Sequence, residues 1–117
     1  MMTDKVVAFS TCATEEEALK VARRLLEARV AACVSITQTV RSLYHWQGEI
    51  QDDAEFLLVI KSRRDLMDRL KSELRAAHSY VTPELVVMPI VDGLPDYLEW
   101  MDKELAHPPG RDPGPLA

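Results

Sequence analysis

The segment Val40-Arg41-Ser42-Leu43-Tyr44-His45-Trp46-Gln47-Gly48-Glu49-Ile50-Gln51 decides the fold of this chain. Apolar and polar residues alternate through residues 31–46 and again through residues 49–61. Alternation with a period of two residues indicates an extended strand with one polar face. Gln47-Gly48 stands between the two runs and is typical of a tight turn. We therefore predict two unusually long strands joined as a β-hairpin.

The segments on either side of the hairpin predict the remaining elements. Residues 6–10 indicate a short buried strand, and Thr14-x-x-Glu17 forms a capping box that begins a helix ending near Arg29. Ser62, with Asp65 three residues on, is predicted to begin a second helix that ends before His78. Residues 84–91 read as an edge strand that contains Pro89, and a last helix starts near Pro95.

This order of elements is β-α-β, β-α-β and a short C-terminal helix. It predicts an α+β fold, the ferredoxin-like split β-α-β sandwich, with a four-stranded antiparallel sheet and two helices on one face. We expect one domain at residues 1–106. Residues 107–117 are rich in Pro and Gly and are predicted to be a disordered tail.

The composition of the chain argues against nucleic-acid binding and against membrane association. The chain has 117 residues, a net charge of −5 and a pI of about 5.1, so it should repel nucleic acid and anionic membranes. No apolar run approaches the roughly 18 residues that a membrane helix needs. The N-terminus lacks the pattern of a signal peptide, and the two cysteines, Cys12 and Cys33, are expected to be reduced thiols. We therefore expect a cytoplasmic protein.

The length of the hairpin predicts self-association. Strands average about 5–6 residues, and these two are more than twice as long, so part of the ribbon should extend beyond the body. Its exposed edges and the aromatic residues Tyr44 and Trp46 near its tip favour pairing with other copies of the chain. The alternative is a solvated arm kept soluble by Glu49, Asp52 and Asp53.

Four segments in order resemble the CutA family of divalent-cation tolerance proteins. They are Ala31-Ala32-Cys33-Val34, Ser42 to Glu49, His78-Ser79-Tyr80-Val81-Thr82-Pro83-Glu84-Leu85, and Asp96-Tyr97-Leu98-x-Trp100, and the resemblance spans residues 5–105. It implies a ferredoxin-like homotrimer built by pairing long hairpins. It also implies a non-enzymatic protein that binds divalent metal ions, copper above all, and that has no organic cofactor.

The resemblance also directs attention to metal ligands. Copper-binding bacterial members carry a Cys at the end of the first strand and one or two His at the end of the second helix. Here Ser10 stands at the Cys position and His78 is the His that matches, while Cys12 has the parity of Ser10 and can substitute if the strand extends that far. The candidate ligands are thus His78, Cys12 and Glu84, completed if needed by a neighbouring subunit. The alternative for His78 is a histidine that bonds the last carbonyls of its own helix.

A second group of residues is expected at a cleft between subunits. Tyr44, Trp46, Tyr80 and Trp100 are aromatic residues of the kind that interfaces favour. Glu55 and Lys61 share a parity and are expected to line the cleft with Tyr80 and Glu84. Such a cleft could bind a small charged ligand, but we favour a structural ion pair.

The alternative function is a trimeric scaffold or small-ligand sensor similar to the PII proteins. The short Gln47-Gly48 turn and the lack of a Gly-rich phosphate cradle count against it. An enzyme with this fold is not expected, because the sequence shows neither a nucleophile–His–acid set nor a cationic side chain placed to bind a phosphate group.

Overall fold

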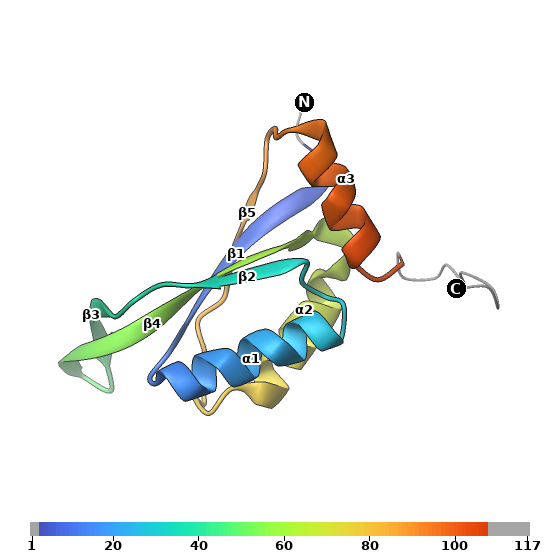
Figure 1. Ribbon diagram of the computed structural model, residues 1–117. Helices are drawn as coiled ribbons and strands as arrows, with labels where there is room; N and C mark the ends of the chain where they lie inside the picture. The colour runs from blue at the N-terminus through green and yellow to red at the C-terminus, as the bar shows by residue number, and fades with distance from the viewer. Residues whose placement is uncertain (1–2, 108–117) are drawn as a thin grey trace.

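A five-stranded antiparallel sheet carries the fold, in the order β2-β4-β1-β5, with β3 paired to β4 alone (Figure 1). In this computed structural model, which describes residues 3–107, the strands are β1 (Lys5–Cys12), β2 (Cys33–Ile36), β3 (Val40–Trp46), β4 (Glu49–Arg63) and β5 (Val86–Pro89). The helices are α1 (Glu15–Glu27), α2 (Met67–Ala77) and α3 (Pro95–Glu104), and a 3₁₀ turn, η1 (Arg64–Leu66), precedes α2. The predicted α+β fold is confirmed. All of the predicted tail except His107 lies outside the described residues.

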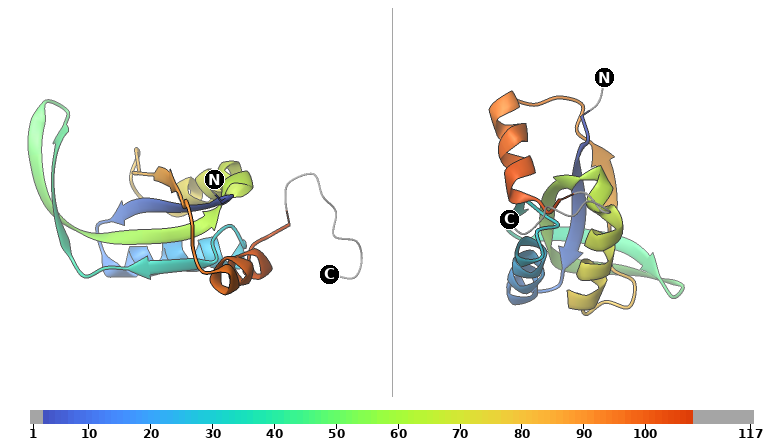
Figure 2. Two further views of the ribbon diagram at one scale, coloured as in Figure 1. Left: turned by 90° about the horizontal axis from the view of Figure 1, so that it is seen from above. Right: turned by 90° about the vertical axis from the view of Figure 1, so that its right-hand side faces the viewer.

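Strand alternation gives the sheet two different faces. Ala8 and Cys12 of β1 and Leu58 and Ile60 of β4 are fully buried on one face. Helices α1 and α2 lie side by side on this face (Figures 1 and 2). The core between helices and sheet also contains Ala18, Val21, Leu25, Val30, Leu70, Leu74 and Ala77. Burial of these side chains, at ~1.5–3 kcal/mol for each large one, fixes the two helices on the sheet.

The start of α1 forms as its sequence predicts, with one difference. Thr14 is the N-cap, and its Oγ1 accepts a hydrogen bond from the backbone N–H of Glu17 at 3.1 Å. The reciprocal bond of a capping box is not among the contacts of the Glu17 side chain, which reaches residues 78 and 79 instead. The carboxylate that the sequence assigns to a helix cap is therefore directed to another part of the fold.

The opposite face of the sheet is open. Its apolar side chains are Val7, Phe9, Leu57 and Val59, all half-buried, with Val86 and Met88 of β5 exposed by 51% and 46%. Neither α1 nor α2 covers this face (Figure 2). The helices α1 and α2 therefore leave these apolar side chains uncovered.

Helix α3 closes the end of the body that lies away from the hairpin tip (Figure 2). Met101 and Leu105 pack on Ala32 and Leu66 in a small second core. Asp102 also pairs with Lys5 at 3.2 Å and with Arg63 at 3.1 Å, and both cationic side chains are buried. Helix α3 thus covers this end of the sheet through apolar contacts and ion pairs.

The hairpin of β3 and β4 extends from the body as an arm, and the molecule measures 51 × 30 × 23 Å (Figure 2). Gln47 and Gly48 have φ values of 50° and 82°. Two successive positive φ values make the turn whose twist suits a two-residue hairpin. Trp46 faces Glu49 across it, as the sequence predicts.

The strand predicted over residues 31–46 is interrupted at residues 37–39, which is a correction. Ile36 pairs with Leu58, but Val40 pairs with Glu55, so one extra residue lies on the β2–β3 side as a β-bulge. A shift of one residue moves every later side chain to the other face of the sheet. Tyr44 and Trp46 therefore share the face of Glu55, and not the face of Val34 and Ile36.

The predicted start of the second helix at Ser62 is also wrong. Strand β4 continues to Arg63, which pairs with Lys5 of β1. The buried Ser62 hydroxyl donates to the Val30 carbonyl at 2.6 Å, so it stabilises the sheet-to-loop contact and caps no helix.

Among residues 3–107, no helix is long and apolar enough to span a membrane.

Candidate functional site

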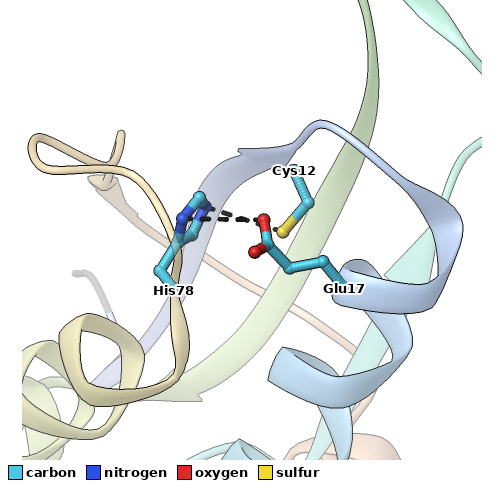
Figure 3. A group of neighbouring side chains, drawn as sticks. All are labelled: Cys12, Glu17 and His78. Atoms are coloured by element: carbon cyan, nitrogen blue, oxygen red, sulfur yellow. Dashed lines mark hydrogen bonds and ion pairs between the residues drawn. The ribbon is translucent and has the colours of Figure 1, made fainter.

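A thiol, a carboxylate and an imidazole meet on the helix-covered face of the sheet at the end of β1 (Figure 3). Cys12 is the last residue of β1, Glu17 lies in the first turn of α1, and His78 directly follows α2. One possible ligand atom from each of the three lies within 4.8 Å of the others. We call these residues the Cys12–Glu17–His78 cluster.

The hydrogen bonds of His78 fix the position of its proton. The backbone N–H of Tyr80 donates to Nδ1 at 3.1 Å, so Nδ1 carries a lone pair. In a neutral imidazole the proton is then on Nε2, which donates to the Thr11 carbonyl at 2.7 Å. The side chain is fully buried. The His78 imidazole thus bonds the end of β1, and only the backbone N–H of His78 bonds a carbonyl of its own helix, that of Leu74, at 3.0 Å.

Glu17 leaves one carboxylate oxygen without a donor. Its Oε2 accepts from the backbone N–H of Ser79 at 3.2 Å. Its Oε1 is buried, has no hydrogen-bond partner among the described residues, and lies 3.8 Å from Nδ1 of His78. Because Nδ1 accepts the hydrogen bond from Tyr80, it has no proton to donate to Oε1. A positive centre at this point would remove an unfavourable contact.

Cys12 is a thiol in this environment. Burial, and next the negative charge of Glu17, raise the pKa of Cys12 to about 12. Its Sγ lies 3.6 Å from Nε2 of His78. Metal binding to such a cysteine must displace a proton, so affinity should rise with pH.

The donor set fits a transition-metal ion. Thiolate and imidazole suit Cu and Zn, and one carboxylate can complete three protein ligands. Cys12, His78 and Glu17 would hold the ion, and the ion would supply the positive charge that the Glu17 carboxylate lacks. Ligation through Nε2 requires His78 to release its proton and its bond to Thr11.

A second site lies on the other face of the sheet, between the hairpin arm and residues 80–84. It is a cavity of about 680 Å³ whose lining includes two carboxylates, two phenols and an indole. The lining residues are Thr11, Arg41, Ser42, Leu43, Tyr44, Trp46, Glu55, Tyr80, Val81, Thr82 and Glu84. We call it the acidic aromatic pocket.

Negative charge dominates the electrostatics of this pocket. Glu55 is 5% exposed and accepts a hydrogen bond from the Tyr80 hydroxyl at 2.8 Å. Burial, then this bond to Glu55, raise the pKa of Tyr80. Glu84 lies at the exposed rim, and partial burial together with the charge of Glu55 raises the pKa of its carboxyl group. At the arm, the bond from the Tyr44 hydroxyl to Asp53 raises the pKa of Tyr44 to about 12.

The structure sorts the predicted site residues into three places. Cys12 and His78 come together as expected, but Glu84 is not among the residues of their cluster and lies in the pocket. Of the predicted cleft residues, the pocket contains Tyr44, Trp46, Glu55 and Tyr80.

Lys61 and Trp100 lie elsewhere, beside Tyr97 of α3. Lys61 Nζ is 3.2 Å from the Tyr97 hydroxyl, and the Trp100 ring is 5.4 Å from the Tyr97 ring. Six residues of strand separate Lys61 from Glu55 by about 20 Å, so they form no ion pair within one chain. Their predicted place at a subunit interface stays a prediction.

Glu17 is the member of the Cys12–Glu17–His78 cluster that the sequence did not predict. Its position three residues after Thr14 explains it fully as a capping residue. The available signal was its place in the first turn of a helix that follows Cys12 by a few residues. That signal has meaning only if the strand is known to reach Cys12.

Comparisons with known proteins agree with the fold and place the chain among relatives. The family model described as CutA1 divalent ion tolerance protein matches residues 6–104. The divalent-cation tolerance protein CutA of Thermus thermophilus is 41% identical over 95 residues, which are 81% of this chain and 92% of that protein. The crystal structure of CutA1 from Oryza sativa is similar with a TM-score of 0.86 and 35% identity, over 90% of this chain and 96% of that chain.

Some relatives are longer than this chain. Protein CutA of Mus musculus is 38% identical over 94 residues, which are 80% of this chain and 53% of that protein. The chain therefore spans about half the length of this curated relative.

Proposed function

Because the chain belongs to the CutA1 divalent ion tolerance family, we propose that it binds a divalent metal ion at the Cys12–Glu17–His78 cluster. Copper is the ion we favour, since thiolate and imidazole are ligands that it prefers. The protein acts in divalent-cation tolerance as a non-enzymatic homotrimer.

One observation supports the metal site most strongly. The buried Oε1 of Glu17 has no hydrogen-bond partner among the described residues, and Nδ1 of His78, 3.8 Å away, accepts from the Tyr80 N–H and has no proton to donate to it. An isolated buried carboxylate oxygen costs free energy unless a cation or donor compensates it. A bound metal ion supplies that compensation.

Calorimetric titration with Cu²⁺, and separately with Zn²⁺, tests the site. Wild type should bind about one ion per chain, and His78→Ala should bind at least about tenfold more weakly. His45→Ala is the matched control, because His45 is exposed near the hairpin tip. Equal binding by wild type and His78→Ala would exclude the cluster. If His78→Ala does not fold, His78→Gln keeps a donor for Thr11 and serves instead.

The homotrimer is supported by surfaces that one chain leaves uncovered. The open sheet face carries Val7, Phe9, Leu57 and Val59, and the neighbouring strand β5 is exposed along its whole length. The hairpin arm offers strand edges as well. Sedimentation equilibrium should give three times the chain mass of 13.2 kDa. A stable folded monomer at micromolar concentration would contradict the assembly.

The cellular location is part of the proposal. Cys12 and Cys33 are both free thiols, which suits a reducing compartment such as the cytoplasm. Cell fractionation with an antibody to the chain tests this, and recovery from an oxidising compartment would contradict it.

The pocket favours small-ligand sensing as a second candidate function. Its carboxylates disfavour nucleotides, because phosphates would meet like charge. We therefore expect ATP to produce no rise in melting temperature in a thermal-shift screen. A clear rise would contradict this expectation and support a sensor of the nucleotide-binding kind.

A further inference from the structure

We propose that the Lys61 ammonium of each chain pairs with the Glu55 carboxylate of the next chain, in a closed head-to-tail ring of three. This inference rests on the proposed homotrimer and adds to it the contact that fixes how neighbouring chains meet. Its support is a pair of opposite charges that one chain leaves without partners, at the two ends of the open sheet face.

The negative charge lies at the arm end of this face. Glu55 is 5% exposed. Among residues 3–107, its carboxylate accepts one hydrogen bond, from the Tyr80 hydroxyl, and makes no ion pair. Arg41, the cationic side chain in the pocket lining, instead binds both carboxylate oxygens of Asp52, at 2.8 and 2.7 Å. A buried carboxylate without a cation is costly, so a second chain that supplies one should bind favourably.

The positive charge lies at the α3 end of the same face. Lys61 follows Glu55 by six residues on β4, so strand alternation places both side chains on one face of the sheet. Its half-buried ammonium lies 3.2 Å from the Tyr97 hydroxyl and 5.1 Å from the centre of that ring, and both partners are neutral. Within residues 3–107, no Asp or Glu makes an ion pair with Lys61. The lysine thus lacks an anion, just as the glutamate lacks a cation.

A head-to-tail arrangement satisfies both charges. The strand places them about 20 Å apart, so they cannot meet within one chain. In a closed ring of three chains the contacts are heterologous, which means that one patch of each chain meets a different patch of the next. The two ends of the open face are patches of this kind, because their charges are opposite. Leu57 and Val59 lie between them on β4 and supply apolar contact area.

The surroundings of the two charges fit each other as well. The acidic aromatic pocket measures about 680 Å³ and has room for a lysine side chain. Tyr97 and Trp100 beside Lys61 are exposed, and so are Tyr44 and Trp46 of the pocket. Interfaces are enriched in Tyr and Trp, which combine a large apolar ring with a polar atom. We therefore expect the Lys61 end of one chain to close the pocket of the next.

Charge reversal tests the pair. Glu55→Lys should raise the protein concentration at which the trimer dissociates by at least about tenfold, because two ammonium groups then meet at each contact. Lys61→Glu should have the same effect, and it provides the test if Glu55→Lys does not fold. The double variant Glu55→Lys/Lys61→Glu should recover most of the loss, since it restores opposite charges. Glu16→Lys, the same change at an exposed position of α1, should leave the dissociation unchanged. Sedimentation equilibrium measures all four variants.

A zero-length cross-link tests the contact in the native sequence. A water-soluble carbodiimide should join the Lys61 amine to the Glu55 carboxylate as an amide and produce covalent trimers on a denaturing gel. In a mixture of ¹⁴N- and ¹⁵N-labelled chains, mass spectrometry should find this amide between the two labels. Lys61→Arg is the matched control, because it keeps the positive charge but lacks the primary amine and should not form the amide.

Three results would overturn the proposal. A wild-type trimer whose swapped double variant dissociates as readily as the single variants would show that Glu55 and Lys61 do not meet, and the trimer would stand without this pair. Covalent dimers without trimers would indicate a twofold contact in place of the ring. A wild-type monomer would remove the trimer and the pair together. Cu²⁺ titration of the Cys12–Glu17–His78 cluster is a separate measurement, so the metal site can fail while this pair stands, and the reverse.

Discussion

Two carboxylates, Glu17 and Glu55, lie near the end of β1 on opposite faces of the sheet, and their surroundings differ. Glu17 is close to a thiol and an imidazole, with their candidate ligand atoms within 4.8 Å of one another (Figure 3). Glu55 borders a cavity of about 680 Å³ with phenol and indole rings. The first place has a sulfur and an imidazole donor, and the lining of the second has neither. The two carboxylates thus carry the same charge in chemically different surroundings.

Tyr80 belongs to both places. Its backbone N–H donates to Nδ1 of His78, its hydroxyl donates to Glu55, and its ring centroid lies 4.7 Å from that of His78. The two sites are therefore neighbours through one residue, but through different atoms of it. This makes their independence testable.

The largest expected effect concerns access to Cys12. In a Cys33→Ala chain, iodoacetamide at pH 8 should alkylate Cys12 at least about a thousandfold more slowly than a short cysteine peptide. Burial raises the pKa of Cys12 to about 12, so little thiolate is present, and the side chain is fully buried. Mass spectrometry over time measures the rate, and denatured chain is the control. An alkylation rate like that of the peptide would show that Cys12 is accessible to solvent.

The next effect separates the two carboxylates. Glu17→Gln should weaken Cu²⁺ binding by about ten- to a hundredfold, the usual result of losing a ligand or its immediate partner. Glu16→Gln is the control, because Glu16 is exposed on the same helix turn. Titration calorimetry of both variants decides, and a Glu17→Gln affinity equal to that of Glu16→Gln would remove Glu17 from the site.

A change at the shared residue tests their independence. Tyr80→Phe removes the hydroxyl that bonds Glu55 and keeps both the backbone N–H and the ring that contact His78. We expect a loss of ~1 kcal/mol in the free energy of unfolding, since a buried carboxylate loses its donor, and an unchanged Cu²⁺ affinity. Urea unfolding and calorimetry measure the two quantities.

Tyr97→Phe is the control for this change, because the Tyr97 hydroxyl also has a charged partner, Lys61, at 3.2 Å but contacts neither site. A fall in Cu²⁺ affinity for Tyr80→Phe alone would show that the two sites are coupled.

The smallest effect concerns the pocket rim. The raised pKa of Glu84 means that the folded chain holds its proton more tightly than the unfolded chain, whose group has the ordinary value of 4.5. Stability from this group therefore falls as pH rises through the raised pKa. The groups that line the cavity with it are Glu55, Tyr80, Tyr44 and Arg41.

Glu84→Gln should accordingly be more stable than wild type at pH 7 and no more stable at pH 3, where the carboxyl group is protonated in both states. The gain should be smaller than the loss in Tyr80→Phe. Thermal unfolding at the two pH values measures it. The same gain at both pH values would point to packing and not to charge.

The predictions from sequence succeeded where a local rule acts alone. Thr14 caps α1, Pro95 begins α3, and Gln47-Gly48 makes the hairpin turn. They failed where a residue has two possible partners. Ser62 has the chemistry of a helix cap, but pairing of β4 with β1 to its last residue makes it part of the sheet.

The sequence by itself determined the order of the elements and the long hairpin, because periodicity and turn chemistry are local properties, while the family resemblance made Cys12 and His78 the metal-ligand candidates. Only the tertiary structure decided that Glu17 joins them, that a bulge turns Tyr44 and Trp46 toward Glu55, and that Lys61 lies far from that carboxylate. The physical reason is that side-chain partners depend on register and on contacts between distant segments, and one inserted residue in a strand reverses the face of all that follow.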